Sequence, residues 1–311
     1  MVPSHTEYKP FRRYSNLHGK YTPVYLIATG GMSEIWACLN HHSGELVAVK
    51  RLLPHSMAEL VSRKSGIWEE HALRTINHPN VLRFIEQGED DGRFCFVTEL
   101  IAGINFDHYL GKHALTIDRF FELGPQMLEG AAAIHAAHLV HGDLKPENMM
   151  LTQDPNGPMG LKILDFGTAT LLRPLPGVEL KVYDPADLLV TAEYVAPELL
   201  TGTPPSVVSD IYALGMSFYQ CLAGKPAFEA PKSRDVLRMQ IHDEPQDLRE
   251  RRGDLPAYLC HWIMKFLDKD PSRRPQTAAE ALDELRTMQR HHPMVKKLTR
   301  RTGTRRVSMR S

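Results

Sequence analysis

Residues 141–148 read His-Gly-Asp-Leu-Lys-Pro-Glu-Asn, and Asp165-Phe166-Gly167 follows a short distance downstream. The first stretch holds a base, a cation and an amide within eight residues, and the second adds a carboxylate. These residue types suit the movement of a charged phosphoryl group under metal control, where positioning and electrostatics do most of the work. The sequence changes from β-rich to mainly helical at Gly103, which predicts two lobes with this stretch at their junction.

The chain before residue 103 is dominated by short β-rich runs. Runs of this length, bounded by Gly30-Gly31 and Ser43-Gly44, are typical of antiparallel strands, and Asp91-Gly92 suits a hairpin turn. One helix is expected before Pro79, because the residue before a proline disfavours helical backbone. The predicted strands cover 24–28, 35–39, 46–51, 81–87 and 93–100, and the predicted helix covers 62–76.

The chain after residue 103 is mainly helical. Apolar residues at helical spacing predict a helix over 116–139, with a kink or a late start at Gly124-Pro125. A strand is expected at 161–164, a long loop at 165–198, and further helices at 208–223, 257–269 and 278–289. The fold class is therefore α+β, with a small antiparallel β-rich lobe followed by a larger helical lobe.

Composition narrows the class of protein. The 311 residues have a formal net charge of +0, so nothing global indicates nucleic acid or a membrane surface. The four cysteines form no close pair, which fits reduced thiols, and the N-terminus has no apolar signal core. We therefore expect a cytoplasmic protein. Residues 1–20 are expected to be a tail, and 291–311 form a second, basic tail.

Three further motifs complete a recognisable set. Residues 28–35 read Ala-Thr-Gly-Gly-Met-Ser-Glu-Ile, residues 47–50 read Val-Ala-Val-Lys, and residues 196–198 read Ala-Pro-Glu. In order and spacing, residues 21–290 resemble a eukaryotic-like (Hanks-type) Ser/Thr protein kinase with a bacterial-type glycine loop. The resemblance implies the two-lobed kinase fold, with an N-lobe at 21–98, a hinge at 99–103 and a C-lobe at 104–290.

The resemblance also implies a site for ATP in the N-lobe and hinge. The family's G-x-G-x-x-G pattern is only partly met, because Ala28 and Ser33 stand at the first and third glycine positions. Lys50 would meet the α- and β-phosphates and pair with Glu69 on the following helix, which spacing favours over Glu70. The implied nucleotide-binding residues are Ala28, Gly30, Gly31, Ser33, Ile35, Ala48, Lys50, Thr98, Glu99, Ile101 and Met150.

The catalytic roles fall on the opening stretch. Asp143 matches the residue that accepts the substrate hydroxyl proton, and Lys145 the cation that steadies the transferred group. Asn148 and Asp165 would hold Mg²⁺, which prefers oxygen ligands. Thr191 matches the threonine that contacts both Asp143 and Lys145 in Ser/Thr members.

Gly142 departs from the family, whose members mostly have arginine there. That arginine usually meets a phosphate on the activation segment, so the enzyme is expected not to depend on phosphorylation of Thr168, Thr170 or Tyr183. The same His-Gly-Asp also occurs in kinase-like enzymes that act on small molecules. Against that alternative, a Glu198–Arg274 ion pair and Asp210 beneath the catalytic loop are expected protein-kinase landmarks.

The sequence therefore predicts ATP-dependent phosphorylation of Ser/Thr hydroxyls in proteins. A pseudokinase or ATP-binding scaffold is an alternative, because the glycine loop is altered. Arg-Arg-x-Ser occurs in both tails, which makes Ser15 and Ser308 candidate autophosphorylation sites and Glu147 a candidate attractor of basic substrate residues. His135, His138 and His141 are spaced suggestively for a metal, but a helix end explains the first two better.

Overall fold

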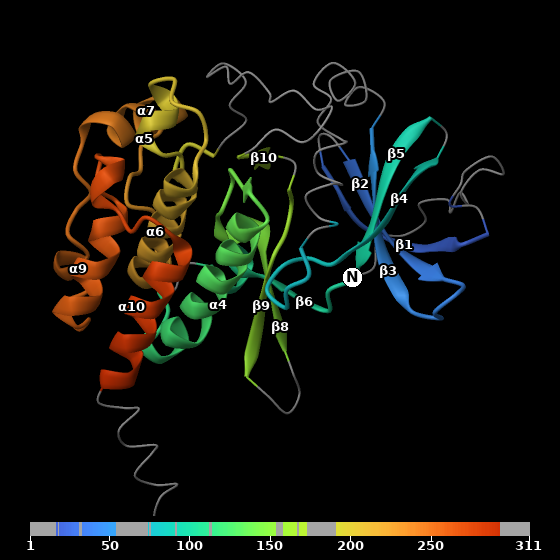
Figure 1. Cartoon of the computed structure of the whole chain (residues 1–311), viewed down its shortest axis with the longest axis horizontal. Coiled ribbons are helices and arrows are strands. Elements are labelled where there is room, and N and C mark those ends of the chain that lie inside the picture. The colour runs from blue at the N-terminus through green and yellow to red at the C-terminus, as the bar shows by residue number, and fades with distance from the viewer. Residues whose placement is uncertain are drawn as a thin grey trace, which may run out of the picture.

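The structure is a computed structural model with two lobes that lie side by side (Figure 1). It describes residues 17, 19–30, 33–53, 74, 76–90, 92–111, 114–153, 158–166, 168–172 and 191–292. The small lobe, on the right of Figure 1, is a β-sheet, whereas the large lobe on the left is mainly helical. The α+β architecture predicted from the sequence is confirmed. The helix expected at 62–76 lies outside the described residues.

The small lobe is one antiparallel sheet in the strand order β1-β2-β3-β5-β4. Directly paired residues of neighbouring strands share a face. Ile35 pairs with Lys50, and Ala48 pairs with Thr98, so these four side chains lie on one face of the sheet. On this face, Lys50 contacts Asp165 of the large lobe. The strands are β1 (Tyr21–Thr29), β2 (Ser33–Asn40), β3 (Leu46–Leu52), β4 (Phe84–Asp90) and β5 (Arg93–Glu99).

The opposite face of this sheet carries the small lobe's own core. Val49 and Val97 are fully buried there, and so is Leu17, at 0% exposure. The Tyr21 hydroxyl donates to Glu86 Oε1 at 2.6 Å, which joins β1 to the far edge strand β4. The chain therefore contributes to the core from Leu17 onward, within the segment expected to be a tail.

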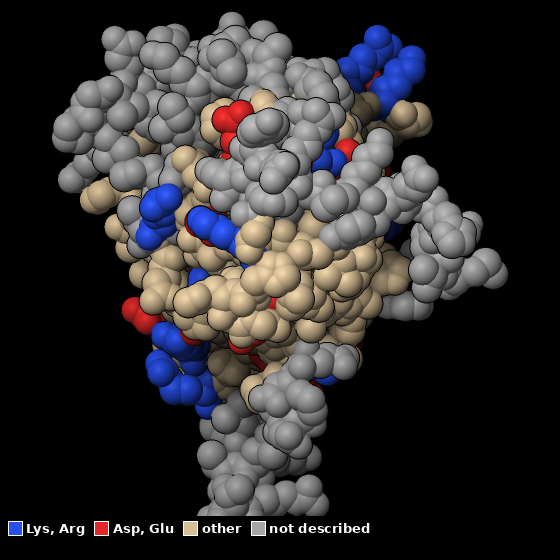
Figure 2. All heavy atoms as spheres, turned by 90° about the vertical axis from the view of Figure 1, so that its right-hand side faces the viewer, with Lys and Arg blue, Asp and Glu red and all other residues tan. Residues whose placement is uncertain are grey.

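The outer end of the small lobe exposes apolar side chains of β1. Val24, Tyr25 and Ile27 are 51%, 50% and 44% exposed. Two register shifts in the β1–β2 pairing disturb the inward–outward alternation along this strand. Figure 2 shows this end of the molecule, where the described residues are mostly uncharged and Lys and Arg side chains gather toward the margins.

The large lobe is built around two long helices, α4 and α6. Phe218 of α6 packs against Phe120 of α4 with ring centroids 5.4 Å apart, and against Trp262 and Phe266 of α9 at 5.6 Å each. The helices are α3 (Phe106–Leu110), α4 (Ile117–Ala136), α5 (Pro197–Leu200), α6 (Val207–Ala223), α7 (Ser233–His242), α8 (Leu248–Arg251), α9 (Ala257–Phe266) and α10 (Ala278–His291), with short 3₁₀ turns η1 (Pro146–Asn148) and η3 (Pro271–Arg273).

Helix α4 runs without a break through Gly124-Pro125, so the predicted late start is wrong. Pro125 lacks the N–H that would bond to the carbonyl of Phe121 one turn earlier. Gln289 of α10 supplies the missing donor, because its Nε2 lies 3.1 Å from the Phe121 oxygen. The neighbouring helix thus satisfies the carbonyl that the proline leaves open, which lets the helix continue.

Short strands lie near the centre of Figure 1, between the sheet of the small lobe and the helices of the large lobe. Val81, predicted to begin a strand, instead makes an isolated bridge to Ile163, and β4 begins later. Asn80 Nδ2 donates to the Leu161 carbonyl at 2.8 Å, which ties this segment to the large lobe. The central strands are β6 (Gly103–Asn105), β7 (Leu139–Val140), β8 (Met149–Gln153), β9 (Met159–Ile163) and β10 (Thr170–Leu171).

Several elements lack a sequence prediction. Helices α3, α5 and α8 and the strands β6, β7, β8 and β10 have five residues or fewer, so their periodicity is weak. Helix α7 has ten residues and was also not predicted. Among the described helices, none combines the length and apolar character that a membrane span requires.

Candidate active site

The first turn of α6 holds the backbone of the 141–148 loop. The Asp210 carboxylate is 1% exposed and accepts the N–H groups of His141 at 2.8 Å and Gly142 at 2.9 Å. His135 Nε2, from the end of α4, lies 2.9 Å from the same carboxylate. A buried carboxylate is stable only when such partners surround it. Asp210 therefore braces the loop, as the sequence predicted.

His141 connects this loop to the segment that contains Asp165. Its ring is fully buried and packs on Phe166 with centroids 5.0 Å apart. Nδ1 accepts the Asp143 N–H at 3.2 Å, so Nε2 carries the proton and donates to the Leu164 carbonyl at 2.9 Å. Phe166 belongs to the core of the large lobe, and Phe84 of β4 in the small lobe packs against the same core.

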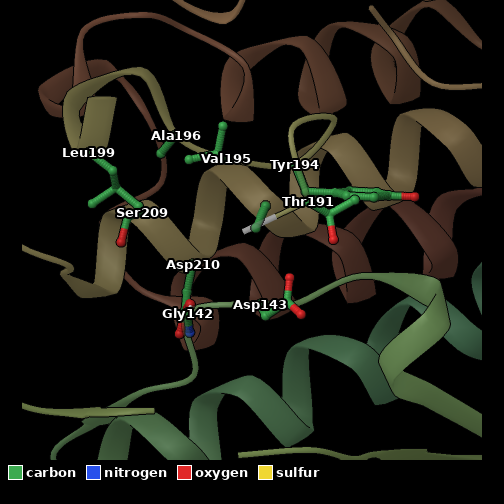
Figure 3. Close-up of a pocket in the computed structure, with 10 residues that line it drawn as sticks. Gly142, Asp143, Thr191, Tyr194, Val195, Ala196, Leu199, Ser209 and Asp210 are labelled. Atoms are coloured by element: carbon green, nitrogen blue, oxygen red, sulfur yellow. Dashed lines mark hydrogen bonds between the residues drawn. The ribbon is translucent and has the colours of Figure 1, made fainter. Parts of the chain in front are cut away.

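Asp143 and Thr191 line a small hollow (Figure 3), and Lys145 contacts both of them. Lys145 Nζ lies 2.7 Å from Asp143 Oδ2 and also contacts the Thr191 hydroxyl. Asn148 Nδ2 donates to the same Asp143 carboxylate at 2.7 Å. Each of these side chains is therefore fixed by at least one other. The hollow has a volume of about 10 Å³, room for about one water molecule.

Lys50 reaches across the interlobe space to Asp165. Its Nζ lies 3.0 Å from Asp165 Oδ1, and the Asp165 side chain is 51% exposed. Asp165 has a left-handed backbone with φ of 54°, a conformation that aspartate adopts more readily than most residues. The predicted phosphate-binding cation and the predicted metal-binding carboxylate thus lie in direct contact.

The predicted Mg²⁺ ligands fit that ion. The amide nitrogen of Asn148 is used by Asp143, so its amide oxygen is the group that remains to act as a ligand. Together with the half-exposed Asp165 carboxylate, this gives two oxygen ligands, which leaves coordination positions for water and phosphate oxygens, as Mg²⁺ sites usually require. Within the described part of the chain, no cluster of three or more His, Cys, Asp or Glu side chains forms another metal site.

Five of the residues predicted to bind the nucleotide share one face of the small-lobe sheet: Ala28, Ile35, Ala48, Lys50 and Thr98. Register places Ala28 beside Ile35, and Ile35 beside Lys50. Met150 of β8 lies opposite Asn105, on the large-lobe side. Gly30 donates its N–H to the Ser33 carbonyl at 2.9 Å, which closes the turn of the glycine loop. Gly31 and Glu69 lie outside the described residues, so the predicted Lys50–Glu69 pair stays a prediction.

The hinge residue Glu99 has its side chain in a structural role. Glu99 Oε1 accepts from Lys162 Nζ at 2.7 Å and from the Arg83 N–H at 2.8 Å. Thr98, only 8% exposed, donates its hydroxyl to the Glu99 carbonyl at 3.3 Å. Glu99 therefore fixes the start of the hinge to β9, and any nucleotide contact from it would come from the backbone. Lys162 lies in a predicted strand, and nothing in the pattern of that strand distinguishes it as a partner of the hinge.

Glu198 and Arg274 form the predicted ion pair. Arg274 Nη1 and Nη2 lie 2.7 and 2.8 Å from the two Glu198 carboxylate oxygens, a bidentate arrangement. The Arg274 side chain has 0% exposure and that of Glu198 has 10%. The pair fixes α5, which follows directly after the segment that carries Thr191.

Gly142 has a backbone conformation that favours glycine. Its φ is 80°, and a Cβ at this position would lie 3.0 Å from the Thr168 carbonyl oxygen. The Thr168 hydroxyl also donates to the His141 carbonyl at 3.0 Å. The space beside Gly142 is therefore taken by the segment after Asp165.

Glu147 lies in an acidic neighbourhood beside the catalytic loop. Burial raises the pKa of the Glu147 carboxyl, and the carboxylates of Asp107 and Asp143 add to the rise, while Lys145 opposes it. Asn105 donates to the Glu147 carbonyl at 2.7 Å. Burial also raises the pKa of the nearby Tyr194 hydroxyl, and the carboxylates of Glu147 and Asp107 raise this pKa further.

Comparison with known proteins agrees with this geometry. The protein kinase domain family model matches residues 21–285, so the chain belongs to the protein kinase family. It is 32% identical over 273 residues to Serine/threonine-protein kinase pkn2 of Myxococcus xanthus and 31% identical over 275 residues to Serine/threonine-protein kinase PknA of Mycobacterium tuberculosis. The resemblance to bacterial members of the Hanks-type Ser/Thr class is thereby confirmed.

These relatives are longer than the matched region. The first match covers 86% of this chain but 32% of the pkn2 protein, and the second covers 86% of this chain and 61% of PknA. Serine/threonine-protein kinase pkn3 of Myxococcus xanthus is 28% identical over 301 residues, which are 52% of its length. The chain therefore spans between about a third and three fifths of these relatives.

Proposed function

We propose that the chain transfers the γ-phosphoryl group of Mg-ATP to Ser or Thr hydroxyls of proteins. The observation that carries this proposal is the position of the Lys145 side chain, which contacts both the Asp143 carboxylate and the Thr191 hydroxyl. This contact joins the proton acceptor to the segment on which a peptide would rest. The bidentate Glu198–Arg274 pair below that segment supports a protein substrate over a small molecule.

In the proposed reaction the substrate hydroxyl oxygen forms a bond to the γ-phosphorus, and the bond from that phosphorus to the β–γ bridging oxygen breaks. Asp143 orients the hydroxyl and accepts its proton, and ADP leaves. Lys145 offsets charge on the transferred group, and Lys50 holds the α- and β-phosphates. Asn148 and Asp165 would hold Mg²⁺, which supplies positive charge to the β- and γ-phosphate oxygens.

A phosphotransfer assay with radiolabelled ATP and a generic basic protein tests this proposal. Asp143→Asn is expected to lower the rate by about 10²–10⁴-fold, the usual contribution of a positioned proton acceptor. ATP binding should be unchanged in this variant, which serves as the matched control. ATP binding by the wild type without transfer to any protein would favour the scaffold alternative, and transfer to small molecules alone would favour the small-molecule kinase.

The proposal includes independence from activation-segment phosphorylation. Gly142 offers no cation to a phosphate there, and the Thr168 carbonyl occupies the space next to it. Enzyme treated with phosphatase should keep its full rate with no lag. A loss of activity that returns on phosphorylation of Thr170 or Tyr183 would contradict this part. Thr168→Ala is a weaker test, because the Thr168 hydroxyl also positions His141.

Substrate preference and autophosphorylation are further parts of the proposal. The partly buried Glu147, beside Asp107 and Asp143, favours substrates with basic residues near the phosphorylated hydroxyl. Ser15 and Ser308, the proposed autophosphorylation sites, lie outside the described residues. Phosphosite mapping after incubation with Mg-ATP tests them, and labelling at other residues alone would remove the idea. A cytoplasmic location is also proposed, since the four cysteines are buried free thiols.

A further inference from the structure

Gln240 is a polar residue of α7 whose side chain is fully buried. Its exposure is 0%, and with Val236 one turn earlier it forms the buried face of this helix. An amide at an apolar position of an amphipathic helix needs partners for its donors and its acceptor, because an unsatisfied buried polar group is costly. The partners of Gln240 therefore show what this residue does.

All the polar atoms of the Gln240 side chain are engaged. Nε2 donates to the carbonyl of Ala192 at 3.0 Å and to the carbonyl of Glu193 at 2.9 Å. Oε1 accepts from the hydroxyl of Tyr212, a fully buried residue of α6, at 2.6 Å. Tyr212 thus orients the amide so that both of its N–H groups point at the backbone of residues 192 and 193.

The backbone of residues 191–196 depends on such donors. The segment contains a turn and no strand, so no neighbouring strand pairs with its carbonyls. The Tyr194 N–H closes the turn onto the Thr191 carbonyl at 3.1 Å. Ala192, Tyr194 and Val195 are 7%, 5% and 4% exposed, so water has little access to replace a lost donor. Gln240 supplies donors where the turn itself has none.

The turn leads directly to the catalytic residues. Thr191 begins it and contacts Lys145 Nζ, which lies 2.7 Å from Asp143 Oδ2. Figure 3 shows Thr191 and Asp143 at the same hollow, with Tyr194 beside them. On the other side, Lys269 Nζ donates to the Gln240 carbonyl at 2.8 Å and fixes the helix behind the amide. A continuous set of contacts therefore runs from α7 to the proposed proton acceptor.

We propose that Gln240 is a positioning residue for phosphoryl transfer to proteins, acting through the 191–194 turn on Thr191, Lys145 and Asp143. It touches neither the nucleotide-binding face nor the reacting atoms. This inference rests on the proposed function, because it assigns Gln240 to the protein-substrate side of that reaction. Its loss should therefore affect the protein substrate and leave ATP binding in place.

Gln240→Met is the main test variant, because it keeps an unbranched side chain of similar length and removes both donors and the acceptor. The matched control is Tyr219→Phe on α6, which removes one buried hydrogen bond, to the Gln246 carbonyl at 2.9 Å, away from the turn. Initial rates are measured with histone as the basic protein substrate, varying histone and ATP separately. Hydrogen exchange of the amides of residues 191–196 is measured on the same proteins.

For Gln240→Met we expect kcat/KM for histone to fall by about tenfold or more, with KM for ATP within about twofold of wild type. Exchange of the Tyr194 amide should become faster. Tyr219→Phe should leave kcat/KM for histone and exchange of the Tyr194 amide unchanged, although both variants lose stability. If Gln240→Met does not fold, Tyr212→Phe takes its place, because it removes only the hydrogen bond to Gln240 Oε1. It should lower kcat/KM for histone by a smaller factor and leave KM for ATP unchanged.

Wild-type kinetics together with wild-type exchange in Gln240→Met would overturn the inference. An equal rise in KM for ATP would also overturn it, because that result indicates general loosening of the lobe. A histone-specific loss in Tyr219→Phe would do the same. If the wild-type protein transfers no phosphate to histone, the proposed function fails, and the exchange measurement still shows whether Gln240 fixes the turn.

Discussion

Replacing Arg274 by methionine is expected to lower the free energy of unfolding by about 3–5 kcal/mol, the usual cost of leaving one member of a buried ion pair alone. The change removes the partner of Glu198, whose side chain is 10% exposed. It also removes a guanidinium that lies over the ring of Tyr212, with Cζ 4.7 Å from the ring centroid. A loss of this size is a large share of the roughly 5–15 kcal/mol by which domains are stable.

The hydrogen bonds of Arg274 support this magnitude. Besides its two bonds to Glu198, it donates to the carbonyls of Asp268 at 2.8 Å, Val208 at 3.1 Å and Lys269 at 3.4 Å. Methionine would remove these donors, and a buried polar group left unsatisfied costs about 1–3 kcal/mol. Partial entry of water would reduce the sum, so the ion-pair figure is the better guide.

Urea unfolding followed by circular dichroism measures this cost, and Glu198→Gln and the double variant complete a cycle. Each single variant leaves an unpaired buried group, so the double variant should cost less than the sum of the two by about 0.5–3 kcal/mol. A loss below about 1 kcal/mol for Arg274→Met, the level of an exposed pair, would refute the reasoning. Additive single effects would refute the coupling of the two side chains.

Two further predictions concern Gly142 and Lys269. Gly142→Ala should cost about 1–2 kcal/mol for its left-handed backbone, plus crowding against Thr168. The control is Gly44→Ala, because Gly44 has a φ of 74° and open space where a Cβ would lie. In the same urea titration it should show the backbone cost alone. Equal losses of unfolding free energy in the two variants would contradict a role for Thr168. Burial lowers the pKa of Lys269 from 10.5 to about 8, so the folded state binds fewer protons than the unfolded state between these values. The free energy of unfolding should therefore rise with pH across this window, and this rise should be smaller in Lys269→Met. Identical pH slopes for wild type and Lys269→Met would contradict the lowered pKa of Lys269.

The contacts among the proposed catalytic side chains were predictable because these residues share one short motif. Asp143, Lys145 and Asn148 lie within one loop, so their contacts with one another follow from local geometry. The contact of Lys145 with Thr191 is long-range and came only through the family resemblance, and the structure bears it out. The contact of Lys50 with Asp165 was not predicted. The roles of these residues in the reaction are proposals.

The supporting contacts were not predictable, because they join elements whose patterns are weak or conflict with local rules. Pro125 indicates a break in α4, and only the position of Gln289 on α10 shows why the helix continues. Gln240 lies on α7, a ten-residue amphipathic helix that was not predicted from the sequence. One signal was present nonetheless: a glutamine one turn after Val236, at a position that an amphipathic helix would give to an apolar residue.

Gly142 shows how a departure from a family pattern acquires a structural reason. The sequence alone indicates a missing cation and therefore a missing site for a regulatory phosphate. The structure adds that the Gly142 N–H is bound by Asp210 at 2.9 Å with φ of 80°, and that the Thr168 carbonyl lies where a Cβ would go. An arginine at this position would crowd the Thr168 carbonyl, which would have to shift, and the Thr168 hydroxyl holds the His141 carbonyl. Introducing an arginine would therefore strain the contact between the segment after Asp165 and the 141–148 loop.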